Sequence, residues 1–149
     1  MLFRSRNTLA NSTVAFNSEL TTDPGACEGG LNYRTQLHIE STIVARNSCD
    51  GRPLDITALP DSPPIIGANN LVEFSTVPLP PDTISANPHL MPVGDNGGPT
   101  RTHALRPDSP AIDSGNNIPG LHFDQRGSGF PRVNGPRADI GAYESPASL

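Results

Sequence analysis

The sequence lacks tryptophan and lysine altogether, and it has only two cysteines in 149 residues. Apolar residues make up 34% of the chain, and none of its apolar runs approaches the ~20 residues of a membrane-spanning helix. Two cysteines without a Cys-x-x-Cys pair are too few for a zinc site unless histidines join them. The net charge of −5 and the scattered arginines leave no basic surface of the kind that binds nucleic acid. We therefore expect neither a membrane span nor a nucleic-acid partner.

Proline and glycine are abundant, with 17 and 14 residues respectively. Each proline inside a helix would cost about 3 kcal/mol, so helices are excluded from most of the chain. Such a composition is common in disordered chains, but the small net charge does not favour self-repulsion. A turn-dense all-β protein with many short strands fits both facts, and the length suits one domain with a modest core.

A weak internal repeat runs through the first two thirds of the chain. A β-branched aliphatic residue stands three positions before Asn17, Asn47, Asn69 and Asn87. The intervals of roughly 20–30 residues are typical of solenoids, in which stacked asparagines can bond one another at successive turns. The sequence therefore predicts about three to four short coils of a parallel β-helix, with strands in residues 8–16 and 35–45 and with Asn17 stacked on Asn47. The alternative is that abundant asparagine produces the pattern by chance.

Residues 95–144 combine tight turns with short apolar runs. The run Asp95-Asn96-Gly97-Gly98-Pro99 is a concentrated turn signal, because glycine and asparagine tolerate positive φ and proline ends a ladder. Four blocks follow one another in this region: NGGPT-x-THAL from Asn96, SPAID-x-G from Ser109, DQRG from Asp124 and DIGAYE from Asp139.

This succession of blocks resembles the C-terminal signature of bacterial choice-of-anchor Q domain proteins, over about a third of the chain. The resemblance implies a right-handed parallel β-helix of the pectin-lyase-like type and a secreted or cell-surface location. It implies no particular reaction, because none is generally assigned to that family. The chain departs from the family pattern at Asp108, where glycine is usual, and in having no sorting tail after Glu144.

We expect one domain overall, with irregular β-helix coils in residues 1–94 and a capping region in residues 95–149. Phe123, Phe130 and Tyr143 are available to cover the last coil. The first residues hold no apolar segment of a signal peptide, because Arg4 and Arg6 follow at once. Under the resemblance, the chain is therefore a fragment or has a misplaced start, and its partners are upstream β-helix coils of a longer chain and, at the surface, glycans or other cell-surface proteins.

The acidic residues of the blocks admit two interpretations. As an enzyme, Asp113, Asp124 and Asp139 with Arg126 would supply a carboxylate pair and a cation for glycoside cleavage, or the acids would bind Ca²⁺. As a scaffold, each acid would pair with arginine and turn N–H groups. Residues 101–149 hold five arginines and five acids, which favours the scaffold. We expect Arg126 to bond Asp139 or Asp113, and no cofactor or metal, with Ca²⁺ as the alternative.

The predicted structural motif comprises eleven residues. They are Asn96, Gly97, Gly98, Asp113, Gly115, Asp124, Arg126, Gly127, Asp139, Gly141 and Glu144.

Cysteine and histidine offer little further chemistry. Cys27 and Cys49 could pair and close a loop worth roughly 3 kcal/mol, or remain two free thiols; both possibilities stay open. The four histidines have no metal-site spacing and favour structural roles. A serine triad through Ser109 is disfavoured, because Pro110 removes the backbone N–H that an oxyanion hole uses. The sequence thus predicts a non-catalytic structural module with adhesion or glycan contact, the alternative being a fragment of a pectin-lyase-like polysaccharide lyase or glycoside hydrolase.

Overall fold

The computed structural model describes residues 7–23 and 27–146, and within these ranges it contains strands and turns but no helix. The all-β expectation is therefore confirmed. The eleven strands are β1 (Asn7–Ala10), β2 (Thr13–Ala15), β3 (Ser18–Glu19), β4 (Leu31–Tyr33), β5 (Leu37–Glu40), β6 (Ile43–Ala45), β7 (Ser48–Cys49), β8 (Arg52–Pro53), β9 (Ile56–Ala58), β10 (Ile66–Ala68) and β11 (Leu71–Val72).

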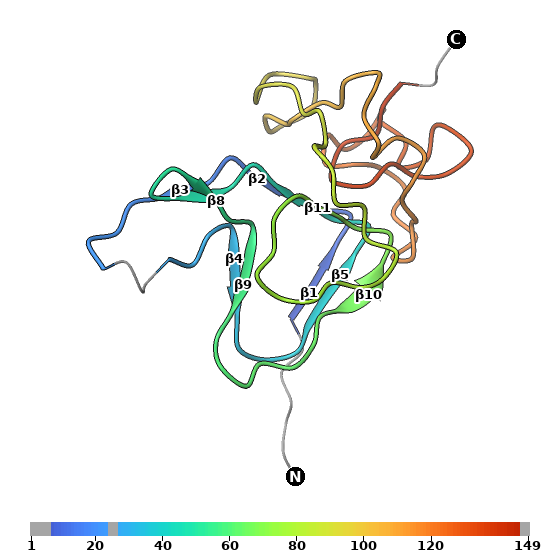
Figure 1. The fold of residues 1–149 in the computed structure, drawn as a ribbon. Coiled ribbons are helices and arrows are strands. Elements are labelled where there is room, and N and C mark those ends of the chain that lie inside the picture. The colour runs from blue at the N-terminus through green and yellow to red at the C-terminus, as the bar shows by residue number, and fades with distance from the viewer. Residues whose placement is uncertain (1–6, 24–26, 147–149) are drawn as a thin grey trace.

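The strands form four small sheets, which we name A to D. Sheet A has the order β1-β5-β10, sheet B β11-β6-β2, sheet C β3-β7-β8 and sheet D β4-β9. All neighbours are parallel except β7 and β8. The chain visits sheets A, B and C in β1–β3 and again in β5–β7, so each strand lies beside its counterpart one pass later (Figure 1).

The predicted equivalence of Asn17 and Asn47 is confirmed. The Asn17 Nδ2 donates to the Asn47 Oδ1 at 2.8 Å across 30 residues of sequence. The Asn47 Nδ2 donates in turn to the buried Asp55 Oδ1 at 2.9 Å and to the backbone oxygens of Val14 and Ala45. These bonds satisfy backbone groups at a corner where the ladder is interrupted.

The later members of the predicted repeat are wrong in register. Ile66, in β10, belongs to sheet A, where it pairs with His38, and not to sheet B beside β6. Asn70, not Asn69, consequently occupies a buried corner position, accepting from the Thr42 N–H at 3.0 Å and donating to the Ile39 oxygen. The predicted repeat aligns Ile84 with Val44. In the structure Ile84 forms a single bridge with Leu71, and Leu71 pairs with Ile43, so Ile84 and Asn87 are also shifted from the predicted register.

The apolar core has two parts, on opposite faces of sheet B. Along β6, Val44 points to one side, whereas Ile43 and Ala45 point to the other, as the alternation of a strand requires. The inner core consists of Tyr33, Leu37, Ile39, Val44, Ile56, Ile65 and Val72. The outer core consists of Ile43, Ala45, Leu71, Leu105, Ala111, Ile140 and Tyr143. Sheet B is therefore buried on both faces.

The described part of the C-terminal region packs against the outer face of sheet B. Its Ile140 and Tyr143 join the outer core, and the Gly141 N–H donates at 2.9 Å to the backbone oxygen of Ser41, which lies between β5 and β6. Figure 1 shows this region, in orange and red, beside the end of the molecule that carries β2 and β11. Capping of the last coil by this region stays a prediction, and the segment after β11 supplies Val77 and Leu79 to the inner core.

Candidate functional site

The four predicted blocks come together around DIGAYE, the last of them. The Ile140 N–H donates to the Ala111 oxygen of SPAID, and the Gly115 N–H donates to the Ala138 oxygen, both at 2.8 Å. The Gln125 N–H of DQRG donates to the Ala142 oxygen at 3.0 Å. The Gln125 Nε2 in turn donates to the Thr100 hydroxyl of NGGPT at 3.0 Å, so the motif is one connected structure and not four separate turns.

Arg126 lies at the centre of this structure and is buried. Its Nη2 donates to the Asp124 Oδ2 and to the Glu144 backbone oxygen, each at 2.6 Å, and its Nε lies 3.0 Å from the same Asp124 oxygen. Its guanidinium carbon lies 4.1 Å from the ring centroid of Phe130 and 3.9 Å from that of Tyr143. A planar cation with fixed donors suits a place between two rings and a carboxylate, which an ammonium would fill poorly.

The prediction of which carboxylate pairs with Arg126 was wrong. We expected Asp139 or Asp113, but the observed carboxylate is that of Asp124, two residues away. Asp139 is occupied by other groups, because its Oδ1 accepts from the Asp113 N–H and its Oδ2 from the Ser145 N–H. Phe130 and Tyr143 flank Arg126, Tyr143 also joins the outer core, and Phe123 is 46% exposed, so their role in covering the last coil stays a prediction.

The acids of the motif mainly satisfy backbone N–H groups. The Asp124 oxygens accept from the N–H groups of Arg126 and Glu144, both at 2.8 Å. The Asp113 Oδ1 lies 3.4 Å from the Arg137 N–H, a longer contact, and Asp113 is half-buried. Carboxylates that accept N–H groups in this way hold turns that have no ladder of their own.

Glu144 and Arg132 form a second buried pair, and Arg132 was absent from the predicted motif. The Glu144 oxygens accept from the N–H groups of Asn134 and Asp139 at 2.9 Å, and one oxygen lies 3.7 Å from the Arg132 Nη1. Burial raises the pKa of Glu144 to about 7 and lowers the pKa of Arg132. Arg132 is 1% exposed, and its Nη2 donates to the backbone oxygen of Asp139 at 2.6 Å. Only the charge balance of the region hinted that a further arginine would be buried.

The motif glycines fall into two kinds. A Cβ on Gly98, Gly115 or Gly141 would lie within 3 Å of atoms of Arg126, Asp139 or Thr13 respectively, so these positions require close approach. Gly127 has φ of +84° with open space around it, so only its backbone conformation favours glycine. The predicted turn is confirmed at Gly97, where the N–H donates to the Asp95 Oδ1 and φ is +89°.

Asn96 fastens that turn. Its side-chain amide donates to the Thr102 backbone oxygen at 2.9 Å and lies 3.0 Å from the Thr102 hydroxyl. The turn therefore closes the chain between Gly94 and Thr102, which form an antiparallel bridge.

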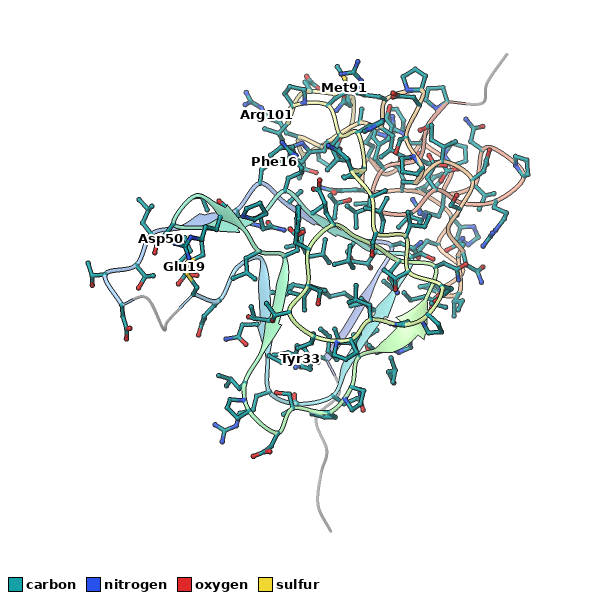
Figure 2. All side chains as sticks on the ribbon, in the orientation of Figure 1. Phe16, Glu19, Tyr33, Asp50, Met91 and Arg101 are labelled. Carbon is teal, nitrogen blue, oxygen red and sulfur yellow. A yellow bond between two sulfur atoms is a disulfide. The ribbon has the colours of Figure 1, made fainter. Side chains whose placement is uncertain are left out.

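Cys27 and Cys49 form a disulfide, with 5.7 Å between their Cα atoms. Figure 2 shows this bond near Glu19 and Asp50, in the part of the molecule that carries sheet C. Across the described ranges, the only cluster of three metal-ligand side chains joins these cysteines to Asp50, and its sulfurs are already bonded to each other. The motif acids form no such cluster within those ranges, so the Ca²⁺ alternative remains a prediction. A helix long and apolar enough to cross a membrane is likewise absent from the described residues.

A pocket of about 560 Å³ lies between residues 7–76, which we call the strand region, and the loops of residues 87–108 that follow it. The strand region contributes Phe16 and Arg46, and the C-terminal loops contribute His89, His103 and Arg106. From the sequence, His89 and His103 were expected to have structural roles, and Phe16, Arg46 and Arg106 carried no prediction. Their positions in the sequence carry no common spacing, so only the packing of the two regions reveals the pocket.

Comparisons with protein-family models, with curated proteins and with solved structures found no match for this chain. Any functional conclusion therefore depends on the geometry above: the order of the parallel strands, the buried motif and the pocket.

Proposed function

We propose that the chain is a non-catalytic structural module, formed by closing coils of a right-handed parallel β-helix in a bacterial protein of the choice-of-anchor Q kind. Repeated visits to sheets A and B, and parallel pairing between counterpart strands, support this architecture. The stacked Asn17 and Asn47 support it further, because such ladders form where successive coils turn at the same corner.

The observation that carries the proposal is the unpaired edge of the first pass. Within the described residues β1 pairs only with β5, and β2 only with β6. Leu9 and Leu31 are half-buried and border a hollow of about 400 Å³ at this edge. A parallel edge with an accessible apolar interior favours addition of another strand. We assign this edge to a further β-helix coil as its partner.

Two other features support the proposal. The disulfide Cys27–Cys49 favours an oxidising environment, and therefore a secreted or cell-surface location. The carboxylates of Asp124 and Asp139 are committed to arginine or backbone N–H groups. A polysaccharide lyase or glycoside hydrolase would need two solvent-facing carboxylates with at least one uncompensated, so these bonds favour the scaffold over that alternative.

The test is whether the β1 edge captures another β edge. In a solution of the isolated chain, the edge available for capture belongs to a second copy, so light scattering should show association that increases with concentration. In dilute solution, where the chain is monomeric, β1 should be less protected from hydrogen exchange than β11. Along β1, backbone N–H groups alternate in direction: those of Asn7 and Asn11 donate toward β5, and that of Thr8 points away from it. Thr8→Pro therefore removes a donor from the outer edge of β1 without breaking its pairing with β5, and it should abolish association. Leu20→Arg is the control, since it removes an 85% exposed leucine and should leave association unchanged. A monomer at all concentrations, with β1 as protected as β11, would contradict the proposal.

A further inference from the structure

Phe16 and Arg46 occupy the same corner on successive passes. Each follows directly after a paired residue, since Ala15 of β2 pairs with Ala45 of β6. Both adopt left-handed backbone conformations, with φ of 59° and 62°. Such a conformation is uncommon for a bulky aromatic residue and strains its backbone. The fold thus places an aromatic ring and a guanidinium side by side, both about half exposed, at the rim of the pocket.

The opposite wall of the pocket supplies a second ring. The His103 imidazole stacks on Phe16, with centroids 4.9 Å apart and an interplanar angle of 29°. The His103 Nδ1 lies 2.8 Å from the Met91 oxygen, and because a carbonyl only accepts, Nδ1 carries the hydrogen. Figure 2 shows Phe16 facing the loops that carry Met91 and Arg101. Because stacked rings cover part of each other, the pair offers the pocket only an outer ring face and the ring edges.

The charged groups of the pocket are only loosely paired. The Arg46 Nη1 lies 3.7 Å from Glu73, and the Arg106 Nε lies 3.9 Å from Asp108. Within the described residues neither guanidinium donates a hydrogen bond, unlike that of Arg126. The closer partner of Asp108 is the His89 Nδ1, at 3.1 Å. Two arginines with free donors therefore line a pocket whose one acidic side chain, that of Asp108, is exposed and lies near the His89 Nδ1 without a hydrogen bond to it.

We propose that this pocket binds a carboxylate attached to a ring, with an acidic sugar as the favoured source. The carboxylate pairs with Arg46 and Arg106, whose planar donors match its two oxygens. The ring of the ligand packs against the accessible face or edge of the stacked Phe16–His103 pair. Asp108 then accepts hydrogen bonds from ring hydroxyls, which favours a sugar over a simple aromatic acid. The volume of about 560 Å³ lies within the range of small-molecule sites.

The proposal goes beyond the structural role and is tested separately, by NMR titration of the full ¹⁵N-labelled chain. The probes are 3′-sialyllactose against neutral lactose, and 4-hydroxybenzoate against 4-hydroxybenzyl alcohol. We expect 3′-sialyllactose to shift resonances of the pocket and to bind at least about tenfold more tightly than lactose. Binding of 4-hydroxybenzoate alone would support the ring-carboxylate site and overturn the sugar assignment. Equal binding of acids and their neutral partners, or no binding of either acid, would overturn the proposal.

Variants then locate the site. Arg46→Gln and Arg106→Gln should each weaken binding of the acid by about tenfold, whereas Arg34→Gln, an exposed arginine outside the pocket, should change it less than twofold. Phe16→Asn removes the ring without straining the backbone, because asparagine tolerates positive φ. It should weaken both acids while the spectrum outside the pocket stays that of the folded chain. Unchanged affinity in all three pocket variants would contradict the assignment.

Discussion

The strand region and the C-terminal region are stabilised by different kinds of bond. In residues 7–76 parallel backbone ladders and the inner core connect each pass to the next. In residues 88–146 the structure shows only isolated bridges, at Leu90, Gly94 and Phe123 with their partners. There single backbone bonds between turns, such as that from the Ile140 N–H to the Ala111 oxygen, are supplemented by the carboxylates of Asp124, Asp139 and Glu144, which accept further backbone N–H groups.

The C-terminal region therefore shows how a chain rich in proline and glycine can stay ordered without a β-ladder. A ladder divides its stabilisation over many equivalent bonds, so it tolerates the loss of any one of them. The C-terminal motif concentrates its bonds on a few buried ionic groups, and removing one partner leaves the other charge buried and unpaired. We therefore expect single substitutions to have larger effects in the motif than in the ladders.

The largest effect is expected for Arg126→Ala. It strips the buried Asp124 of its cation and should lower the free energy of unfolding by about 3–5 kcal/mol. Arg126→Lys should recover only part of the loss, because lysine keeps the charge but not the two-pronged geometry. Urea unfolding measures both, with the exposed Arg34→Ala as the control. Equal stability of Arg126→Ala and wild type would show that the motif does not depend on this pair.

The disulfide is the matching test for the strand region. The double variant Cys27→Ser, Cys49→Ser opens a loop spanning 22 residues and should cost roughly 3 kcal/mol. Hydrogen exchange should show the loss around β3, β4 and β7, with residues 95–146 protected as before. Loss of protection in the motif to the same extent would mean that the two regions unfold as one unit.

A pair of glycines separates backbone strain from packing between the regions. Gly141→Ala places a Cβ 2.8 Å from the Thr13 hydroxyl and 2.9 Å from the Ile43 Cδ1, whereas Gly127→Ala meets no atom within 4 Å. Both have positive φ, so both carry backbone strain. We expect Gly141→Ala to be less stable than Gly127→Ala by about 1–3 kcal/mol in thermal melts. Identical melts would show that the region does not rest tightly on sheet B.

The last prediction concerns the dependence of stability on pH. Burial raises the pKa of Glu144 from 4.5 to about 7, so the folded chain holds a proton there that the unfolded chain releases above 4.5. Its contribution to stability is therefore complete below pH 4.5 and is lost as the pH rises through about 7. Measured between pH 4 and 8, the free energy of unfolding should fall by no more than about 1.4 kcal/mol per pH unit from this group. Glu144→Gln should remove that slope; persistence of the slope would assign it to another group.

Much of the secondary structure could be predicted from the sequence, because it depends on local chemistry. Strands at residues 8–16 and 35–45 were confirmed in part as β1, β2, β5 and β6, each split by a corner. The turn at Asp95–Gly98 was confirmed because its residues satisfy their own backbone. The register of Ile66 was missed, since a three-residue apolar run fits either sheet A or sheet B and only the sheet partners distinguish them.

By itself, then, the sequence determined where the chain turns and that its strands are short, because proline, glycine and asparagine act on their own backbone. The pairing of Cys27 with Cys49 remained open until the sheet register brought the two loops together. Only the tertiary structure decided that Arg126 pairs with Asp124, and that the C-terminal region lies on sheet B. The pocket lined by Phe16 and His103 has the same origin, since it forms where two regions distant in sequence pack together. Such contacts depend on which surfaces bury each other, and no local pattern of residues encodes that choice.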